Sequence, residues 1–311
     1  MLKFLLRVIS KRRISAYFMN RLAVITTYDR RVLRKNRWYE RFFRKNEDVC
    51  FFPDCGLELS FIYLPFGLDR LETAAKGELE RFSDGVGNFC LKNNIADVVM
   101  DEDVWDRSYG RIKIGGVSMH DGSNLMRSFA FDIFSSCCKR FGNDGVFSAV
   151  CIVDKDFSYF SEQLICKICR FVKYIYVDTD EVFMFENFSS RLYEEYGLVL
   201  QRMSKRQSLQ PPGLVIFVDG DAHQALWGKS VVINLSSGRC FENSSRVISD
   251  FDLDFSLNTL FENRKASVEI YKNIFNVSGS VMFKVKKTHI LQSLVKLGVV
   301  DFSQITFGSV S

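Results

Sequence analysis

The feature that most constrains the fold of this chain is a regular alternation of short apolar runs and amphipathic stretches between residues 146 and 235. The runs are apolar throughout, which is typical of strands that are buried on both faces of a parallel sheet. The stretches between them repeat apolar residues at helical spacing. The predicted strands are 146–154, 174–178, 198–201, 214–220 and 231–235, and the predicted helices are 159–172 and 187–197.

This alternation predicts an α/β fold in which residues 143–237 form a Rossmann-like domain with a doubly wound, mostly parallel sheet. A smaller α/β domain is predicted to precede it at residues 47–142, and residues 238–311 are predicted to be a helical region that packs back on the body. In these flanking parts the predicted strands are 57–64 and 95–101, and the predicted helices are 70–82, 123–141, 256–275 and 288–297.

Positive charge is concentrated at the start of the chain. Residues 1–46 contain 14 Lys and Arg but only two acids, Asp29 and Glu40, which gives +12; the other 265 residues therefore carry 5 − 12 = −7. The first 13 residues have the pattern of an amphipathic helix, so residues 1–46 are predicted to be a basic helical segment. This segment could pack on the acidic body, or it could dock on a protein partner, membrane lipid or nucleic acid. An Arg-rich, acid-poor start is also typical of organelle transit peptides, although those are usually shorter.

Composition excludes several classes of protein. With 47% apolar and 25% charged residues, the chain is too hydrophobic for a disordered protein. No uninterrupted apolar run reaches the length of a membrane-spanning helix. Nine cysteines, an odd number without a secretory signal, predict free thiols in a reducing compartment. The predicted location is therefore the cytoplasm, with peripheral membrane contact as an option.

The loop after the first strand of the Rossmann-like domain lacks the glycines that a dinucleotide site requires. Residues 154–160 read DKDFSYF, whereas a G-x-G-x-x-G turn lets the backbone approach a pyrophosphate closely. Two carboxylates in this loop would also repel phosphate. We therefore predict no cofactor and keep NAD(P) as the alternative, in which Asp178 would hold a ribose hydroxyl. The side chains that a cofactor would then meet lie at strand ends: Asp154, Ser158, Asp178, Asp219 and Gly220.

The densest polar cluster, DGDAH at residues 219–223, directly follows a predicted buried strand. Its carboxylates and imidazole could bind a divalent cation or act as acid and base. The pattern is more typical of an acidic turn whose Asp side chains cap the next helix, so we predict no metal site. If the chain is an enzyme, the candidate catalytic residues are His120, His223 and Asp221.

These patterns favour a degenerate Rossmann-like protein that serves as an interaction scaffold or regulatory module, with residues 1–46 as a basic docking segment. Two alternatives stay open. One is a dehydrogenase-like oxidoreductase with an atypical nicotinamide site, in which His120 or His223 would transfer the proton. The other is a nucleic-acid-binding protein that acts through residues 1–46.

Overall fold

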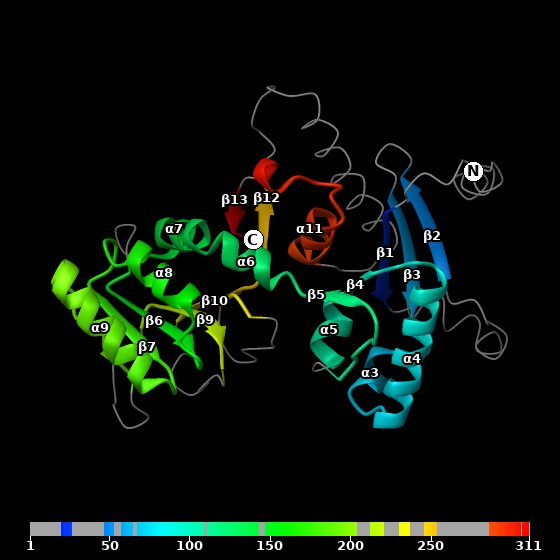
Figure 1. Ribbon diagram of the computed structural model, residues 1–311, viewed down its shortest axis with the longest axis horizontal. Helices are drawn as coiled ribbons and strands as arrows, with labels where there is room; N and C mark the ends of the chain where they lie inside the picture. The colour runs from blue at the N-terminus through cyan, green and yellow to red at the C-terminus, as the bar shows by residue number, and fades with distance from the viewer. Residues whose placement is uncertain are drawn as a thin grey trace. The chain divides into compact units, whose positions relative to one another are not determined.

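The computed structural model describes residues 20–26, 47–52, 57–64, 67–108, 111–142, 147–203, 212–220, 230–236, 246–253, 286–305 and 307–310. The chain divides into two compact units (Figure 1). The first unit comprises residues 1–121 and 257–304, and the second comprises residues 122–256 and 305–311. The division falls at Asp121/Gly122, earlier than the predicted boundary at residue 142.

The first unit contains a five-stranded, mostly parallel sheet in the order β2-β3-β1-β4-β5, in which only β2 runs antiparallel to its neighbour. The central strand β1 pairs with both β3 and β4 and is buried from Leu22 to Thr26. Its strands are β1 (Asn20–Thr26), β2 (Glu47–Phe52), β3 (Leu57–Tyr63), β4 (Asp97–Met100) and β5 (Ser118–His120).

Strand β1 lies within the segment that we predicted to be basic and helical, so the prediction is wrong for residues 20–26. This strand contains only four consecutive apolar residues, and arginine-rich sequence lies on both sides of it. The positive charge of the whole segment therefore favoured a basic surface helix over a buried strand. Residues 1–19 and 27–46 lie outside the described residues, so for them the prediction is untested.

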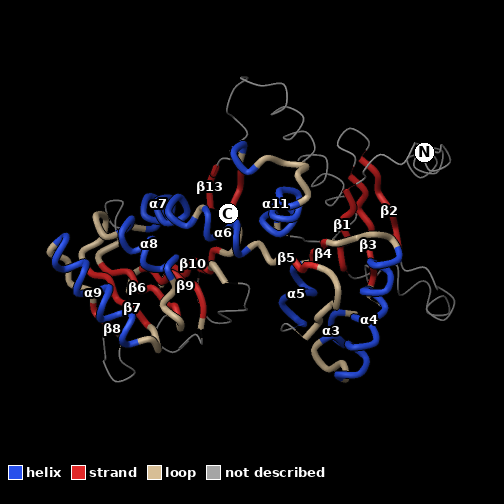
Figure 2. Tube along the Cα trace, viewed as in Figure 1, coloured by secondary structure: helices blue, strands red, loops and turns tan. Residues whose placement is uncertain are grey.

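Helices cover both faces of the first sheet (Figures 1 and 2). On one face, α3 (Leu68–Leu71), α4 (Lys76–Lys92) and α5 (Glu102–Ser108) pack against an apolar core that includes Val98 and Met100. Because side chains alternate along a strand, Asp97 and Val99 point to the opposite face, where α11 (Lys287–Lys296) contacts β4 and β5. Helix α11 matches the prediction at 288–297, whereas the predicted helix at 256–275 lies outside the described residues.

The second unit contains a six-stranded sheet in the order β11-β10-β9-β6-β7-β8, and every neighbouring pair is parallel. From β6 the chain proceeds outward to β7 and β8, returns to β9 beside β6, and then proceeds to β10 and β11. This is the strand order of the doubly wound Rossmann fold, so the fold prediction is confirmed for this unit. Its strands are β6 (Ala149–Asp154), β7 (Tyr174–Asp178), β8 (Gln201–Arg202), β9 (Leu214–Asp219), β10 (Val231–Asn234) and β11 (Arg246–Ile248). Residues 246–248, 251–253 and 307–310 form strands within the segment 238–311 that we predicted to be helical, so that prediction is wrong for them.

The helices of the second unit differ from the prediction at three points, the first of which is that α8 (Tyr159–Ile168) ends before residue 172. The predicted helix 123–141 is interrupted at Phe129, between α6 (Ser123–Ser128) and α7 (Ala130–Phe141). The hydroxyl of Ser128 donates to the carbonyl of Asn124, a side-chain bond that tends to bend a helix. Helix α9 begins at Val182, earlier than predicted, and ends before Gly197, where the left-handed φ of 68° stops it as expected.

Three further elements complete the described chain. Helix α8 covers Tyr159–Ile168, and the antiparallel strands β12 (Phe251–Leu253) and β13 (Phe307–Val310) form a separate ribbon. Helix α7 contacts α8, β10 and β13, which explains why residues 122–142 belong to the second unit. Six cysteines whose side chains the structure describes have free thiols, at positions 90, 137, 138, 151, 166 and 169.

Candidate functional site

The switch point of the second sheet lies between β6 and β9, where a Rossmann fold binds its ligand beyond the carboxyl ends of the strands. The two strands are neighbours, and Asp154 at the end of β6 is in register with Asp219 at the end of β9. This topology brings together two candidate residues that are far apart in the sequence. Asp154 is buried, whereas Asp219 is exposed.

Asp154 closes the first turn of α8 with its own side chain. Its Oδ2 accepts hydrogen bonds from the backbone N–H of Ser158 at 2.7 Å, from the Ser158 hydroxyl at 2.6 Å and from the Ser161 hydroxyl at 2.6 Å. Ser158 is the N-cap residue of α8. A carboxylate of the chain thus occupies the position at the helix N-terminus where a bound anion is stabilised.

The rest of this loop packs inward and binds its neighbours. Phe157 has a left-handed φ of 45° and is fully buried, and its ring packs against those of Phe185 and Phe188 in α9. Lys155 donates its N–H to the carbonyl of Asp219 and accepts at its own carbonyl from the Thr179 hydroxyl. The loops after β6, β7 and β9 are therefore joined by hydrogen bonds.

The other predicted cofactor contacts occupy ordinary strand-end positions. Asp178 is half-buried at the end of β7, beside Val153 of β6. Asp219 Oδ1 accepts the N–H of Gly220, which has a φ of 118°. A Cβ at Gly220 would lie 3.3 Å from the Cβ of Lys155, so a side chain there would strain the turn and press on the loop.

Two of the predicted catalytic residues, His223 and Asp221, lie outside the described residues, and three polar residues that were not predicted lie at the site. Ser161 and Thr179 were not predicted as site residues, although serines four and seven positions after Asp154 are a readable capping pattern. Arg127 was also missed: it donates to the carbonyl of Val218 at the end of β9 and lies over the Phe160 ring.

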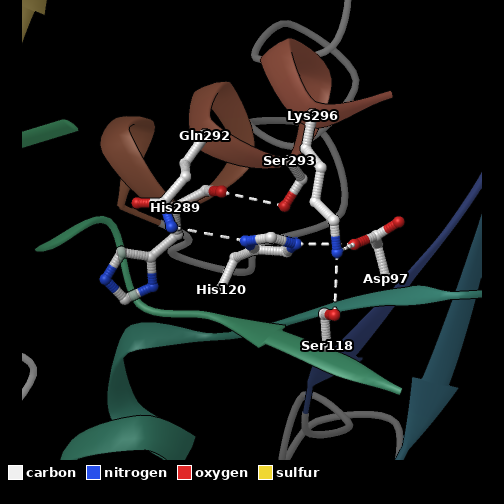
Figure 3. Close-up of polar contacts among 7 residues, drawn as sticks. All are labelled: Asp97, Ser118, His120, His289, Gln292, Ser293 and Lys296. Carbon is white, nitrogen blue, oxygen red and sulfur yellow. Dashed lines mark hydrogen bonds and ion pairs between the residues drawn. The ribbon is translucent and has the colours of Figure 1, made fainter. Parts of the chain in front are cut away.

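His120 belongs to a second polar cluster, which lies between α11 and the sheet of the first unit (Figure 3). Its centre is the buried carboxylate of Asp97, whose Oδ1 lies 2.7 Å from His120 Nε2 and 2.8 Å from Lys296 Nζ. Lys296 also donates to the Ser118 hydroxyl at 2.7 Å, and its side chain is 48% exposed. Asp97 Oδ1 therefore connects His120 of β5 with Lys296 at the end of α11.

The contacts of His120 indicate its tautomer. Because a carboxylate only accepts hydrogen bonds, His120 Nε2 carries the ring hydrogen and donates it in a hydrogen bond to Asp97 Oδ1. The amide Nε2 of Gln292 lies 3.3 Å from His120 Nδ1, which is then the acceptor. These linked groups could relay a proton between the helix surface and the ring. Their bonds already connect α11 with β4 and β5, so in this geometry the cluster fixes the helix on the sheet.

His289 is a buried base on the same helix. Burial is the main cause that lowers its pKa to about 3, and the charge of Lys286 adds to this effect. Its ring meets the edge of Trp105 at 5.8 Å, and within the described part of the chain its Nδ1 has no hydrogen-bond partner. The folded protein therefore holds His289 neutral near pH 7.

We expect His289 to make the first unit less stable in acid. The unfolded chain binds the histidine proton near pH 6.5, whereas the folded chain binds it only near pH 3. Stability should fall as the pH falls through this window, by up to about 1.4 kcal/mol per pH unit. Urea unfolding of the wild type and of His289→Phe measures the effect, and the stability of the wild type relative to His289→Phe should fall from pH 7 to pH 4. If the free energies of unfolding of the two proteins change equally with pH, His289 does not cause the loss of stability in acid.

The described residues also bear on metal binding and on membrane insertion. No group of three or more His, Cys, Asp or Glu side chains in the described ranges is placed to hold a metal ion. No helix in the described part is both long enough and apolar enough to cross a bilayer.

No protein-family model matches the chain, and no curated protein matches it. Among solved structures, L-tryptophan dehydrogenase from Nostoc punctiforme aligns with 90% of this chain and 80% of its own at 9% identity and a TM-score of 0.28. Aspartate transcarbamoylase from Trypanosoma cruzi covers 74% and 75% of the two chains at 10% identity and a TM-score of 0.25. Shikimate 5-dehydrogenase from Listeria monocytogenes covers 72% and 80% at 12% identity and a TM-score of 0.24. Scores this low support no argument about activity, so the fold assignment depends on the strand order of the second unit.

Proposed function

We propose that this protein is a Rossmann-like interaction module whose switch point is closed by its own residues and does not bind a dinucleotide. The observation that carries this proposal is the set of three hydrogen bonds from the first turn of α8 to Asp154 Oδ2. A pyrophosphate would need the same N–H group and the same helix end. It would have to displace a buried carboxylate that is already satisfied.

Two further features of the loop support the same proposal. The buried ring of Phe157 occupies the inside of the turn, where a dinucleotide fold requires glycine. Asp156 and Asp219 are exposed beside it, and their negative charges oppose the approach of a phosphate. Lys155 is the one exposed cation between Asp154 and Tyr159.

Thermal unfolding with added nucleotides tests the proposal. A site with a Kd of about 10 μM, filled at 1 mM ligand, would stabilise the fold by about 2.7 kcal/mol, which corresponds to a rise in Tm of roughly 5–10 °C. We expect no such rise with NAD, NADP, FAD or ATP. A saturable rise with NAD would overturn the proposal and favour the dehydrogenase-like alternative, with Asp178 as the ribose ligand.

We also propose that the basic N-terminal sequence docks on an anionic surface. Residues 1–19 contain five Lys and Arg and no acid. The position of β1 restricts the test, because removing all of residues 1–46 would also remove the central strand of the first sheet. A truncation must therefore end before Asn20.

Deletion of residues 1–19 should weaken binding to vesicles that contain phosphatidylserine by at least about tenfold, since each basic residue near such a surface contributes about 1 kcal/mol. Cosedimentation with vesicles measures it, and circular dichroism checks that the truncated chain folds. A loss of binding to duplex DNA instead of vesicles would identify nucleic acid as the anionic partner. Unchanged binding to both would contradict the docking proposal.

A further inference from the structure

Four large apolar side chains are exposed in the first turns of α8 and α9, two neighbouring helices of the second unit (Figure 1). The exposed fractions are 74% for Tyr159, 38% for Val182, 72% for Phe183 and 46% for Met184. Both helices follow parallel, adjacent strands, so their N-termini lie at the same edge of the sheet. We call these four side chains the α8–α9 patch.

The α8–α9 patch is separate from the core faces of its helices. Helix α9 buries Phe185, Phe188 and Leu192, and helix α8 buries its own apolar side chains at Leu164 and Ile165. The first turn of α8 is joined to a later turn of α9, where Arg191 pairs with Glu162 at 2.9 Å. The patch residues thus contribute to neither core, and their exposure leaves apolar surface in the first turns of both helices that a partner can cover.

Negative charge surrounds the α8–α9 patch. Asp180 and Glu181 directly precede Val182, Glu186 lies one turn after it, and Asp156 precedes the start of α8; all four are exposed. Among the residues of these two loops and first turns, Lys155 is the exposed cation. The exposed Arg202 of β8 adds a second positive charge, because its guanidinium donates to the carbonyl of Thr179 in the loop before α9. The four acids still outnumber these two cations. An acidic rim around an apolar surface complements a ligand that has apolar anchors and flanking Lys or Arg residues.

We propose that the α8–α9 patch binds a basic amphipathic helix of a partner protein. This inference rests on the proposed function, in which this edge of the sheet serves interaction and not dinucleotide binding. The partner's apolar side chains at positions i, i+3 and i+4 pack on Tyr159 and Phe183, in the way that the apolar face of an amphipathic helix is recognised in other complexes. Its basic side chains pair with the rim acids, which fix its orientation.

A synthetic peptide with the sequence of residues 1–19 is a suitable probe, because it combines an apolar stripe at Leu2, Leu5 and Leu6 with five Lys and Arg. Fluorescence anisotropy with the full-length protein should show saturable binding at micromolar concentration. A scrambled peptide of equal charge should bind at least about tenfold more weakly. A peptide with every Lys and Arg replaced by Glu should not bind.

Surface variants with matched controls locate the site on the protein. The double variant Tyr159→Ser/Phe183→Ser should weaken binding at least tenfold, whereas Tyr193→Ser/Tyr196→Ser, which alters exposed aromatics at the other end of α9, should not. Likewise, Asp180→Asn/Glu181→Gln should weaken binding several-fold, and Glu194→Gln/Glu195→Gln should leave it unchanged. The altered residues are all exposed, and unfolding curves confirm that the variants fold.

Absence of saturable binding, equal binding of the scrambled peptide, or equal effects of the patch and control variants would overturn the inference. These results leave the proposed function intact, because that proposal fails only if a dinucleotide binds. Conversely, a dinucleotide that binds without displacing the peptide would overturn the proposed function alone.

Discussion

Replacing Asp154 with alanine is expected to lower the free energy of unfolding by about 4 kcal/mol. The carboxylate is buried and accepts three hydrogen bonds, and a bond to a charged group contributes about 1.5 kcal/mol or more. The substitution also removes the acid that caps α8 and interacts favourably with its dipole. Urea denaturation followed by far-ultraviolet circular dichroism measures the loss.

Two control variants distinguish the hydrogen bonds of Asp154 from the general effect of removing a negative charge. Asp154→Asn retains one oxygen that can accept from Ser158 or Ser161, so it should lose about half as much stability as Asp154→Ala. Asp156→Asn alters an exposed acid two residues away and should change stability by less than about 0.5 kcal/mol. A loss below about 1 kcal/mol in Asp154→Ala would show that the carboxylate does not hold the turn.

The second large effect is expected in the first unit, at Asp97. Asp97→Ala removes the shared acceptor of His120 and Lys296 and leaves a cavity, so stability should fall by about 3 kcal/mol. Lys296→Met should cost only about 1 kcal/mol, since the ammonium group is half-exposed and water screens its charge. Urea unfolding of both single variants measures these losses.

The double variant Asp97→Ala/Lys296→Met tests whether the two residues act together. Because each single variant already breaks the same contact, the double variant should be less destabilised than the sum of the two losses, by roughly 1 kcal/mol. Hydrogen exchange of the amides in α11 should increase in Asp97→Ala if the cluster holds this helix on the sheet. Additive losses with unchanged exchange in α11 would contradict that role.

Local sequence was sufficient for the central strands of the second sheet but not for the central strand of the first. Strands β6 and β9 each consist of five consecutive apolar residues followed by an acid, and such runs indicate a buried parallel strand. Strand β1 has a shorter apolar core with arginines on both sides, so its charge pattern resembled a surface segment. Its place in the sheet depends on pairing with β3 and β4, which no local pattern encodes.

The two candidate sites also differ in how far local sequence could predict them. The loop after β6 could be predicted to be unsuitable for a pyrophosphate, because its missing glycines and its carboxylates are visible in seven consecutive residues. The cluster around Asp97 could not be predicted, since Lys296 is 199 residues away and Asp97 is an isolated acid in an apolar strand. His120 was identified only because histidine is rare in this chain.

The backbone amides of Lys155, Phe157 and Ser158 give the most direct test of whether Asp154 closes the switch point. Their nitrogen and proton chemical shifts can be followed by NMR in deuterated protein during a titration with NAD to millimolar concentration. We predict that these three resonances stay in place while Asp154 keeps its hydrogen bonds to the turn. A saturable displacement of the Ser158 resonance together with its neighbours would mean that a phosphate has replaced the carboxylate, and it would contradict the account.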